Sequence, residues 1–165
     1  MAKTRARLMG TIAIALTMAT FASVARAQSI EFRRGLSAFN RAEYAAALEN
    51  WAPRARAGEP ESQSGLGFLY YKGLGVPQDS AAAFEWYSLA AAQGQPEAQL
   101  FLGSLYLFGD GVPRDLVKAY AWCEISQSSG AAGGLDCRDE AQRRMSPDQV
   151  AAAIKITADW YARAR

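Results

Sequence analysis

The feature that most constrains this chain is a stretch of sequence that returns after a fixed interval. Residues 66–79 read Leu-Gly-Phe-Leu-Tyr-Tyr-Lys-Gly-Leu-Gly-Val-Pro-Gln-Asp, and residues 102–115 read Leu-Gly-Ser-Leu-Tyr-Leu-Phe-Gly-Asp-Gly-Val-Pro-Arg-Asp, an offset of 36 residues. The same offset relates Trp86 to Trp122, with no insertion between the copies. A period of this size is typical of a solenoid, in which each repeat packs only on its neighbours. The sequence therefore predicts an architecture, and it predicts function only as far as a surface that binds something.

Each repeat is predicted to consist of a helix, a glycine-rich loop and a second helix that stops at a glycine. Paired glycines allow the positive φ that the chain needs where it leaves the first helix, and the proline after them prevents further helix. The aspartate that follows stands where its carboxylate would cap the second helix. The recurring positions are Gly67, Tyr70, Gly73, Gly75, Asp79, Trp86 and Gly94 in one copy and Gly103, Tyr106, Gly109, Gly111, Asp115, Trp122 and Gly130 in the next.

Two of these glycines fall inside a helix. Glycine there costs roughly 1 kcal/mol relative to alanine, so Gly67 and Gly103 indicate a close helix crossing. The recurring tyrosines and tryptophans lie at helical spacing from apolar residues, and we expect them to pack in the core.

The flanking segments predict a cap at each end of the stack. Residues 30–40 and 43–57 show helical apolar spacing without the glycine-rich loop, so residues 28–58 are predicted to be a degenerate capping repeat before full repeats at 59–94 and 95–130. After Gly134 we expect the period to stop and residues 131–165 to form C-terminal capping helices, over about 135–144 and 147–163. Ser146 and Gln149 form a capping box at the start of the last helix. Its buried side is predicted to carry Val150, Ile154, Thr157 and either Trp160 or Tyr161.

The N-terminal residues show the three-part pattern of a secretory signal. Lys3, Arg5 and Arg7 precede an apolar run, and Ala25-Arg26-Ala27 forms a small-residue cleavage site. We expect cleavage after Ala27, which places the protein in the periplasm or outside the cell; the alternative is an uncleaved signal that anchors the chain in the membrane.

The charge of the mature chain argues against nucleic-acid binding. Residues 1–27 hold four basic and no acidic residues, so their removal leaves 14 basic and 16 acidic residues, a net charge of −2. The remaining basic residues are scattered rather than clustered, whereas nucleic-acid binders carry a basic patch. The mature chain is also long enough to bury about two-thirds of its unfolded surface, so we expect no metal or cofactor to hold it together.

Both cysteines, Cys123 and Cys137, lie in the predicted mature chain. An even number of cysteines in an exported protein favours a disulfide. The alternative is that both thiols stay reduced and pack as small apolar groups.

The recurring residues resemble those of a known family. The pattern Leu-Gly-x-x-Tyr-x-x-Gly-x-Gly-Val-x-x-Asp, followed in the first full copy by Ala-x-x-Trp-Tyr-x-x-Ala-Ala-x-x-Gly, is similar to the Sel-one-like repeat, a relative of the tetratricopeptide repeat. The match covers residues 60–130 and is weaker over 30–58. This resemblance implies an all-α fold, a right-handed α-solenoid of about three antiparallel helix hairpins plus capping helices, that serves as an interaction scaffold without chemistry of its own.

Catalysis is not expected. The chain has no histidine, which removes the commonest general base and most zinc sites. Some cysteine-rich members of the family are associated with penicillin binding or β-lactam hydrolysis, so an enzyme of that kind is the competing hypothesis. That chemistry uses Ser-x-x-Lys, and no serine here has a lysine three residues later. We therefore predict no catalytic residue, no metal site and no cofactor.

The concave face of the solenoid is the predicted binding surface. Stacked hairpins leave a surface lined by their first helices, and the positions there that differ between copies are candidates for a groove: Phe68, Lys72, Phe101, Ser104 and Phe108. The phenylalanines predict an apolar groove with a basic rim, suited to an extended or helical segment of a protein partner, such as an envelope or sensor protein. Alternatively, they pack between adjacent repeats. A cell-wall glycan such as peptidoglycan is the other possible ligand, with Gln63 and Gln99 as the clearest amides for a sugar.

Overall fold

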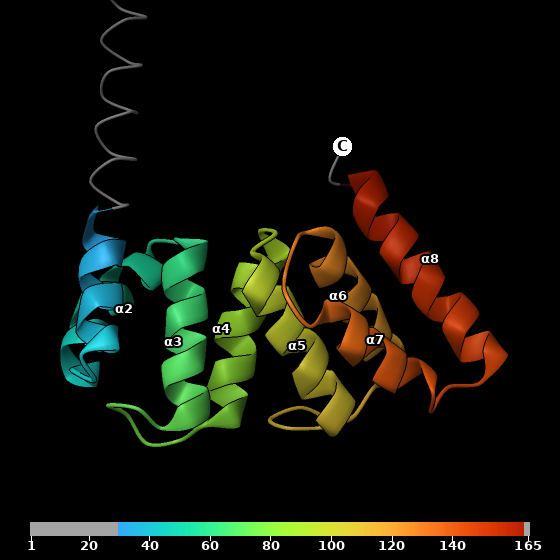
Figure 1. Cartoon of the computed structure of the whole chain (residues 1–165), viewed down its shortest axis with the longest axis horizontal. Helices are drawn as coiled ribbons and strands as arrows, with labels where there is room; N and C mark the ends of the chain where they lie inside the picture. Colours follow the sequence, from blue (N-terminus) through green and yellow to red (C-terminus); the bar gives the residue numbers. More distant parts are fainter. Residues whose placement is uncertain (1–29, 164–165) are drawn as a thin grey trace, which may run out of the picture.

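The computed structural model describes residues 30–163, which form a row of helices packed one against the next (Figure 1). Within these residues the chain forms helices and connecting turns, without a strand. The first helix covers residues 30–40, and the others are α2 (Tyr44–Arg56), α3 (Pro60–Lys72), α4 (Ser80–Ala92), α5 (Pro96–Phe108), α6 (Leu116–Ser128), α7 (Gly134–Gln142) and α8 (Pro147–Arg163). The predicted all-α solenoid is confirmed. The predicted signal peptide, residues 1–27, lies outside the described residues.

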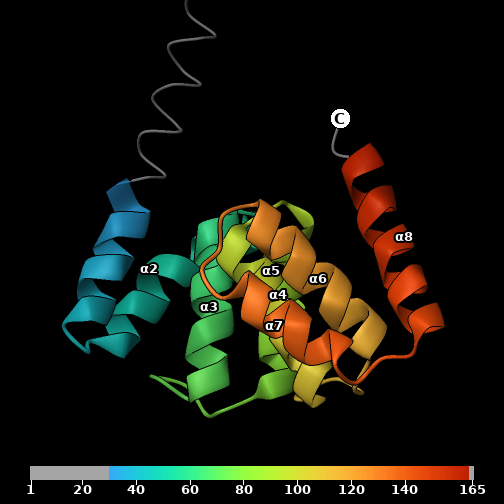
Figure 2. The same ribbon diagram turned by 45° about the vertical axis from the view of Figure 1, so that its right-hand side comes forward.

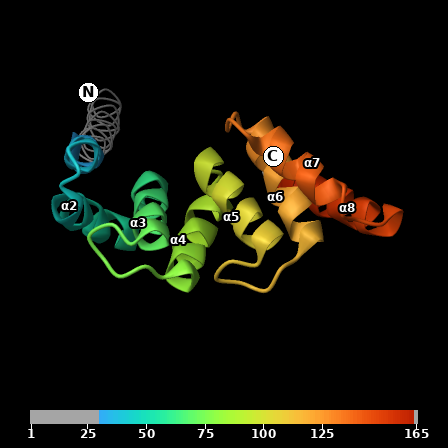
Figure 3. The same cartoon turned by 60° about the horizontal axis from the view of Figure 1, so that its bottom comes forward.

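Each helix packs chiefly on the helices next to it along the chain, as expected for a solenoid. Seen from below, the helices from α2 to α8 follow one another across the molecule (Figure 3). The last helix, α8, is the exception. It stands away from α7 in Figure 2 and packs on α6. None of the helices in residues 30–163 combines the length and the apolar character that a membrane crossing requires.

The residues that end and begin the helices act as predicted. Asp79 Oδ1 accepts a hydrogen bond from the Ala82 backbone N–H at 2.9 Å, and one period later Asp115 Oδ1 accepts from the Lys118 N–H at 3.0 Å. In the loop between α5 and α6, Gly111 has a φ of 71°. A Cβ atom there would lie 2.2 Å from the Ser80 carbonyl oxygen, so this loop needs glycine both for its conformation and for its close approach to α4.

The helices of the repeat meet at a junction that recurs with the period. At the first junction, the Trp51 ring fills the space above Gly65, where a Cβ atom would lie 2.7 Å from the ring. At the second, the Tyr87 ring stacks on the Phe101 ring with 4.9 Å between ring centres.

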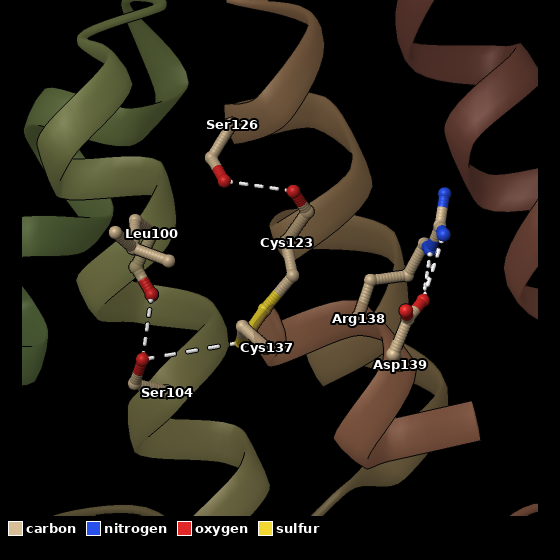
Figure 4. Close-up of a disulfide and its surroundings, with 7 residues drawn as sticks. All are labelled: Leu100, Ser104, Cys123, Ser126, Cys137, Arg138 and Asp139. Carbon is tan, nitrogen blue, oxygen red and sulfur yellow. Dashed lines mark hydrogen bonds and ion pairs between the residues drawn. A yellow bond between two sulfur atoms is a disulfide. The ribbon is translucent and has the colours of Figure 1, made fainter. Parts of the chain in front are cut away.

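At the third junction, the positions 36 residues after Tyr87 and Phe101 are occupied by Cys123 and Cys137. These cysteines form the predicted disulfide (Figure 4). Their Cα atoms are 5.7 Å apart. The bond joins α6 to α7, and Ser104 on α5 lies beside it, with its Oγ 4.0 Å from the Cys137 sulfur. The spatial repeat therefore extends further than the sequence repeat. We predicted that the period stops after Gly134, but α7 takes the place of the first helix of a further hairpin, with Cys137 in the position of Phe101.

The C-terminal helix begins as predicted, and its buried face departs from the prediction at Ile154. Ser146 Oγ accepts from the Gln149 N–H at 3.3 Å, and Gln149 Oε1 accepts from the Ser146 N–H at 2.9 Å, which completes the capping box. Ala153 and Thr157 are buried, whereas Ile154 is 54% exposed, so the prediction for Ile154 was wrong. The helix packs on α6, with Ala153 and Thr157 buried and Trp160 edge-on to Trp122, whereas Ile154 points away from the buried face.

Candidate functional site

A cleft of about 440 Å³ opens across the first helices of three successive hairpins. Its walls come from residues 30–40, α3 and α5, together with Trp51 from α2. These are the helices on which the sequence predicted a binding surface. The position follows from the solenoid itself, because the first helices of neighbouring hairpins lie side by side and leave their outer side chains uncovered.

A chain of aromatic rings forms the floor of the cleft and crosses the boundaries between hairpins. Phe39 lies edge-on to Phe68 with 5.6 Å between ring centres, and Phe68 lies edge-on to Phe101 at 6.0 Å. Towards the N-terminus, Phe32 stacks on Trp51 at 5.9 Å. Edge-to-face and offset-stacked pairs at such distances are favourable. The rings therefore hold one another in place, with Trp51 buried and the four phenylalanines partly exposed.

Glycines on both sides of Trp51 fix its position in the floor. A Cβ atom at Gly35 would lie 2.3 Å from the Trp51 Nε1 atom, and one at Gly65 would lie 2.7 Å from the opposite part of the ring. The indole N–H donates to the Phe32 carbonyl oxygen at 3.3 Å. The tryptophan is therefore held between two helices, and substitution of either glycine would displace it.

Beneath the cleft, Tyr87 supports Phe101 from the buried side. The Tyr87 side chain is fully buried, and its hydroxyl has no hydrogen-bond partner among the described residues. Burial raises the pKa of this hydroxyl well above its ordinary value, with a smaller contribution from Tyr71. Tyr87 therefore stays neutral and acts here as a packing residue.

The charged residues that line the cleft are both acidic. Glu61 and Glu97 stand 36 residues apart, each in the first turn of its helix, where a carboxylate interacts favourably with the helix dipole. The amide of Gln95 donates to Glu97 Oε2 at 2.6 Å and so holds one of these carboxylates at the rim. The predicted basic rim is therefore replaced by an acidic one.

The structure brings together two of the five residues predicted for the groove. Phe68 and Phe101 line the cleft, and their rings also pack on one another between adjacent repeats. Lys72 places its Nζ 5.0 Å from the centre of the Tyr71 ring, and Phe108 is 67% exposed. Both stand at the last position of their helix and outside the cleft lining. Ser104 donates to the Leu100 carbonyl oxygen at 3.0 Å and lies beside the disulfide.

Most of the cleft residues that were not predicted lie in the first hairpin or are the same in both full copies. Phe32, Phe39 and Trp51 belong to the first hairpin, and Glu61 is identical to Glu97 one period later. The period could have identified one of these residues, because Phe32 precedes Phe68 by 36 residues.

The amides proposed for a glycan ligand have a structural role instead. Gln63 and Gln99 are buried, and each donates its Nε2–H to a backbone carbonyl of the preceding helix: Ala55 at 3.1 Å and Ala91 at 3.3 Å. Neither amide faces the aromatic cleft. Within residues 30–163, no three His, Cys, Asp or Glu side chains lie close enough together to hold a metal ion.

Comparisons with known proteins agree on the repeat. Residues 60–95 and 96–126 match the Sel1 repeat family. The chain is similar to the crystal structure of a protective antigen present in uropathogenic Escherichia coli strains displaying an SLR fold, with a TM-score of 0.77 and 28% sequence identity over 81% of this chain and 29% of that one. It is also similar to a Sel1 repeat protein from Oxalobacter formigenes, with a TM-score of 0.55 and 39% identity over 56% of this chain and 27% of that one.

These similarities concern part of larger molecules. The chain spans less than a third of the length of either solved structure. Comparison with curated proteins gives no significant match. What the comparisons establish is therefore the repeat and its fold, which generally mediate protein–protein interaction.

Proposed function

We propose that this chain, whose residues 60–95 and 96–126 match the Sel1 repeat family, is a non-enzymatic scaffold that binds a protein partner in its aromatic cleft. The observation that carries the proposal is the chain of partly exposed rings across three hairpins, bordered by two carboxylates. A few residues supply most of the binding energy in a protein interface, and aromatic side chains are frequent among them because they bury a large area.

The chemistry of the cleft specifies the kind of segment it takes. The rings of Phe39, Phe68 and Phe101 suit apolar anchor side chains, and Glu61 and Glu97 suit lysine or arginine side chains beside those anchors. The cleft runs across neighbouring helices, which suits an extended or helical segment. We propose a partner segment that combines apolar anchors with basic residues.

We further propose that the protein acts after export, in the periplasm or outside the cell. The support is the signal pattern of residues 1–27 and the disulfide between Cys123 and Cys137, a bond that persists in oxidising compartments. Its partner would then be an envelope protein or the exported sensor domain of a membrane protein.

The proposal can be tested by selecting random displayed peptides on immobilised protein that lacks residues 1–27. We expect the selected peptides to combine apolar and basic residues. Phe68→Ala should abolish their binding. A Glu61→Gln, Glu97→Gln variant should weaken it by roughly tenfold at low salt and by less at high salt, because exposed charges are screened.

Two matched variants serve as controls, because each changes an exposed residue of the same type outside the cleft. Phe108→Ala and Glu85→Gln should leave binding unchanged. Circular dichroism should show the same helicity in all variants. If binding survives Phe68→Ala and is lost in Phe108→Ala, the partner surface lies elsewhere and the proposal fails.

A further inference from the structure

A second cavity, of about 510 Å³, lies at the other end of the stack from the N-terminal hairpin. It is bounded by the C-terminal turn of α8 and by the ends of α4 and α6. Its lining includes Gln93, Gln99, Ser129, Trp160, Tyr161 and Arg163.

The preceding repeat shows how the buried glutamine of this site is normally satisfied. Gln63 donates its Nε2–H to the Ala55 carbonyl oxygen at 3.1 Å. Its Oε1 atom accepts a hydrogen bond from the Gln93 Nε2–H at 2.8 Å. Both ends of the buried amide therefore have a partner, as buried polar groups require.

One period later the donor side chain is missing. Gln99 repeats the first bond, from its Nε2–H to the Ala91 carbonyl oxygen at 3.3 Å. The position that corresponds to Gln93 is occupied by Ser129, whose side chain is too short to replace an amide. Gln99 is 0% exposed, and its Oε1 atom has no hydrogen-bond partner among the described residues. The wall of the cavity thus holds a buried acceptor whose counterpart in the preceding repeat receives an amide N–H.

The opposite wall adds a hydroxyl, a cation and an aromatic face. The buried Tyr161 hydroxyl also lacks a partner among residues 30–163. Arg163 donates its Nε–H to the Asp159 carbonyl oxygen at 3.1 Å, and its terminal guanidinium nitrogens have no partner in the part of the chain that the structure describes. Trp160 is held edge-on against Trp122 with 5.0 Å between ring centres.

We propose that this cavity binds a ligand in which an amide N–H stands close to a carboxylate, as in an N-acylated amino acid or the C-terminal residue of a peptide. The amide N–H takes the place that Gln93 fills for Gln63 and donates to Gln99 Oε1. The carboxylate pairs with the Arg163 guanidinium, whose planar fork matches it. Trp160 and Tyr161 cover the apolar part, and the cavity has the volume of a small-molecule site.

Three small probes separate the contributions of the two ligand groups. N-acetylalanine carries both groups, N-acetylalanine amide lacks the carboxylate, and acetate lacks the N–H. We expect N-acetylalanine to shift the NMR signals of the Gln99 side-chain amide and of Tyr161, and the other two probes to bind at least about tenfold more weakly. A short peptide that ends in alanine distinguishes the two sources: tighter binding than N-acetylalanine assigns the site to chain ends, and equal binding assigns it to the free acylated amino acid.

A gain-of-donor variant tests the role of Gln99 without damage to the fold. Ser129→Gln restores the side chain found one repeat earlier, and its amide N–H should donate to Gln99 Oε1. N-acetylalanine binding should therefore fall by roughly tenfold. Ser128→Gln, an exposed neighbour, is the matched control and should bind as the parent does.

The proposal is overturned if N-acetylalanine gives no shifts, or if it binds Ser129→Gln as tightly as the parent. It is also overturned if a crystal structure grown with N-acetylalanine shows the Tyr161 hydroxyl donating directly to Gln99 Oε1, or only water between them.

Discussion

The Tyr87 ring lies nearly parallel to the Phe101 ring, with 14° between the planes and 4.9 Å between the centres. The pair of positions that these rings occupy returns 36 residues later as the disulfide between Cys123 and Cys137. The pair of positions that joins consecutive hairpins is therefore the same in each repeat, whereas the residues at these positions differ. Beneath the cleft the two positions are joined by an aromatic stack. After α6, where the sequence no longer follows the repeat, they are joined by a disulfide.

The disulfide should contribute substantially to stability. It joins residues separated by 14 positions, and a loop of that size corresponds to about 3 kcal/mol in the chain-entropy account. We expect a Cys123→Ala, Cys137→Ala variant to lose roughly this amount of unfolding free energy, measured by urea denaturation without reductant.

The parent protein in reductant is the control for that experiment and should lose a similar amount. Thiol titration of the native protein should find no free thiol before denaturation and reduction. Two free thiols in the native protein, or a variant as stable as the oxidised parent, would show that the cysteines act as separate packing residues.

Removal of the Tyr87 hydroxyl should not harm the protein. The hydroxyl is buried without a partner among the described residues, and such a group costs about 1–3 kcal/mol. Tyr87→Phe keeps the ring on Phe101, so we expect the unfolding free energy to rise by about 1 kcal/mol. Thermal and urea denaturation would measure the change, and a decrease of the same size would mean that the hydroxyl has a bound partner such as ordered water.

The glycines and aspartates at the helix ends made the fold predictable from the sequence. Positions such as Gly73 and Asp79 act through backbone conformation and local hydrogen bonds, which depend on a few neighbouring residues. The end of the stack was harder to predict, because Cys137 keeps the periodic position in α7 while the residues around it no longer follow the pattern. Apolar spacing also did not identify the buried face of α8 in full, because the small side chain of Ala153 is buried there and the larger Ile154 is exposed.

The cleft was predictable only in part, for a geometric reason. The comparison of the two full copies selected positions that differ, and it found Phe68 and Phe101. It also selected Lys72 and Phe108, which are the last residues of their helices and lie outside the cleft lining. The acidic rim was missed because Glu61 and Glu97 are identical and a search for differences passes over them.

Cleavage of the predicted signal peptide is a further prediction. If residues 1–27 are a cleaved signal, the mature protein begins at Gln28. Intact mass and N-terminal sequencing of protein isolated from the periplasm or the medium would test this. Protein that retains Lys3 and stays with the membrane would support an uncleaved anchor instead.

Because α3 and α4 cross closely at Gly67, the effect of Gly67→Ala on the unfolding free energy should depend on the residue at position 87. A Cβ atom at Gly67 would lie 2.9 Å from the Tyr87 ring. Glycine inside a helix normally costs roughly 1 kcal/mol relative to alanine, but overpacking costs about 1–3 kcal/mol. We expect Gly67→Ala to destabilise the parent and to stabilise a Tyr87→Leu background by about 1 kcal/mol, because leucine removes the ring atoms that the methyl group meets. A double-mutant cycle by urea denaturation measures this coupling. The same sign in both backgrounds would mean that helix propensity, rather than the crossing, determines the effect, and that the glycine is not needed for α3 to approach α4.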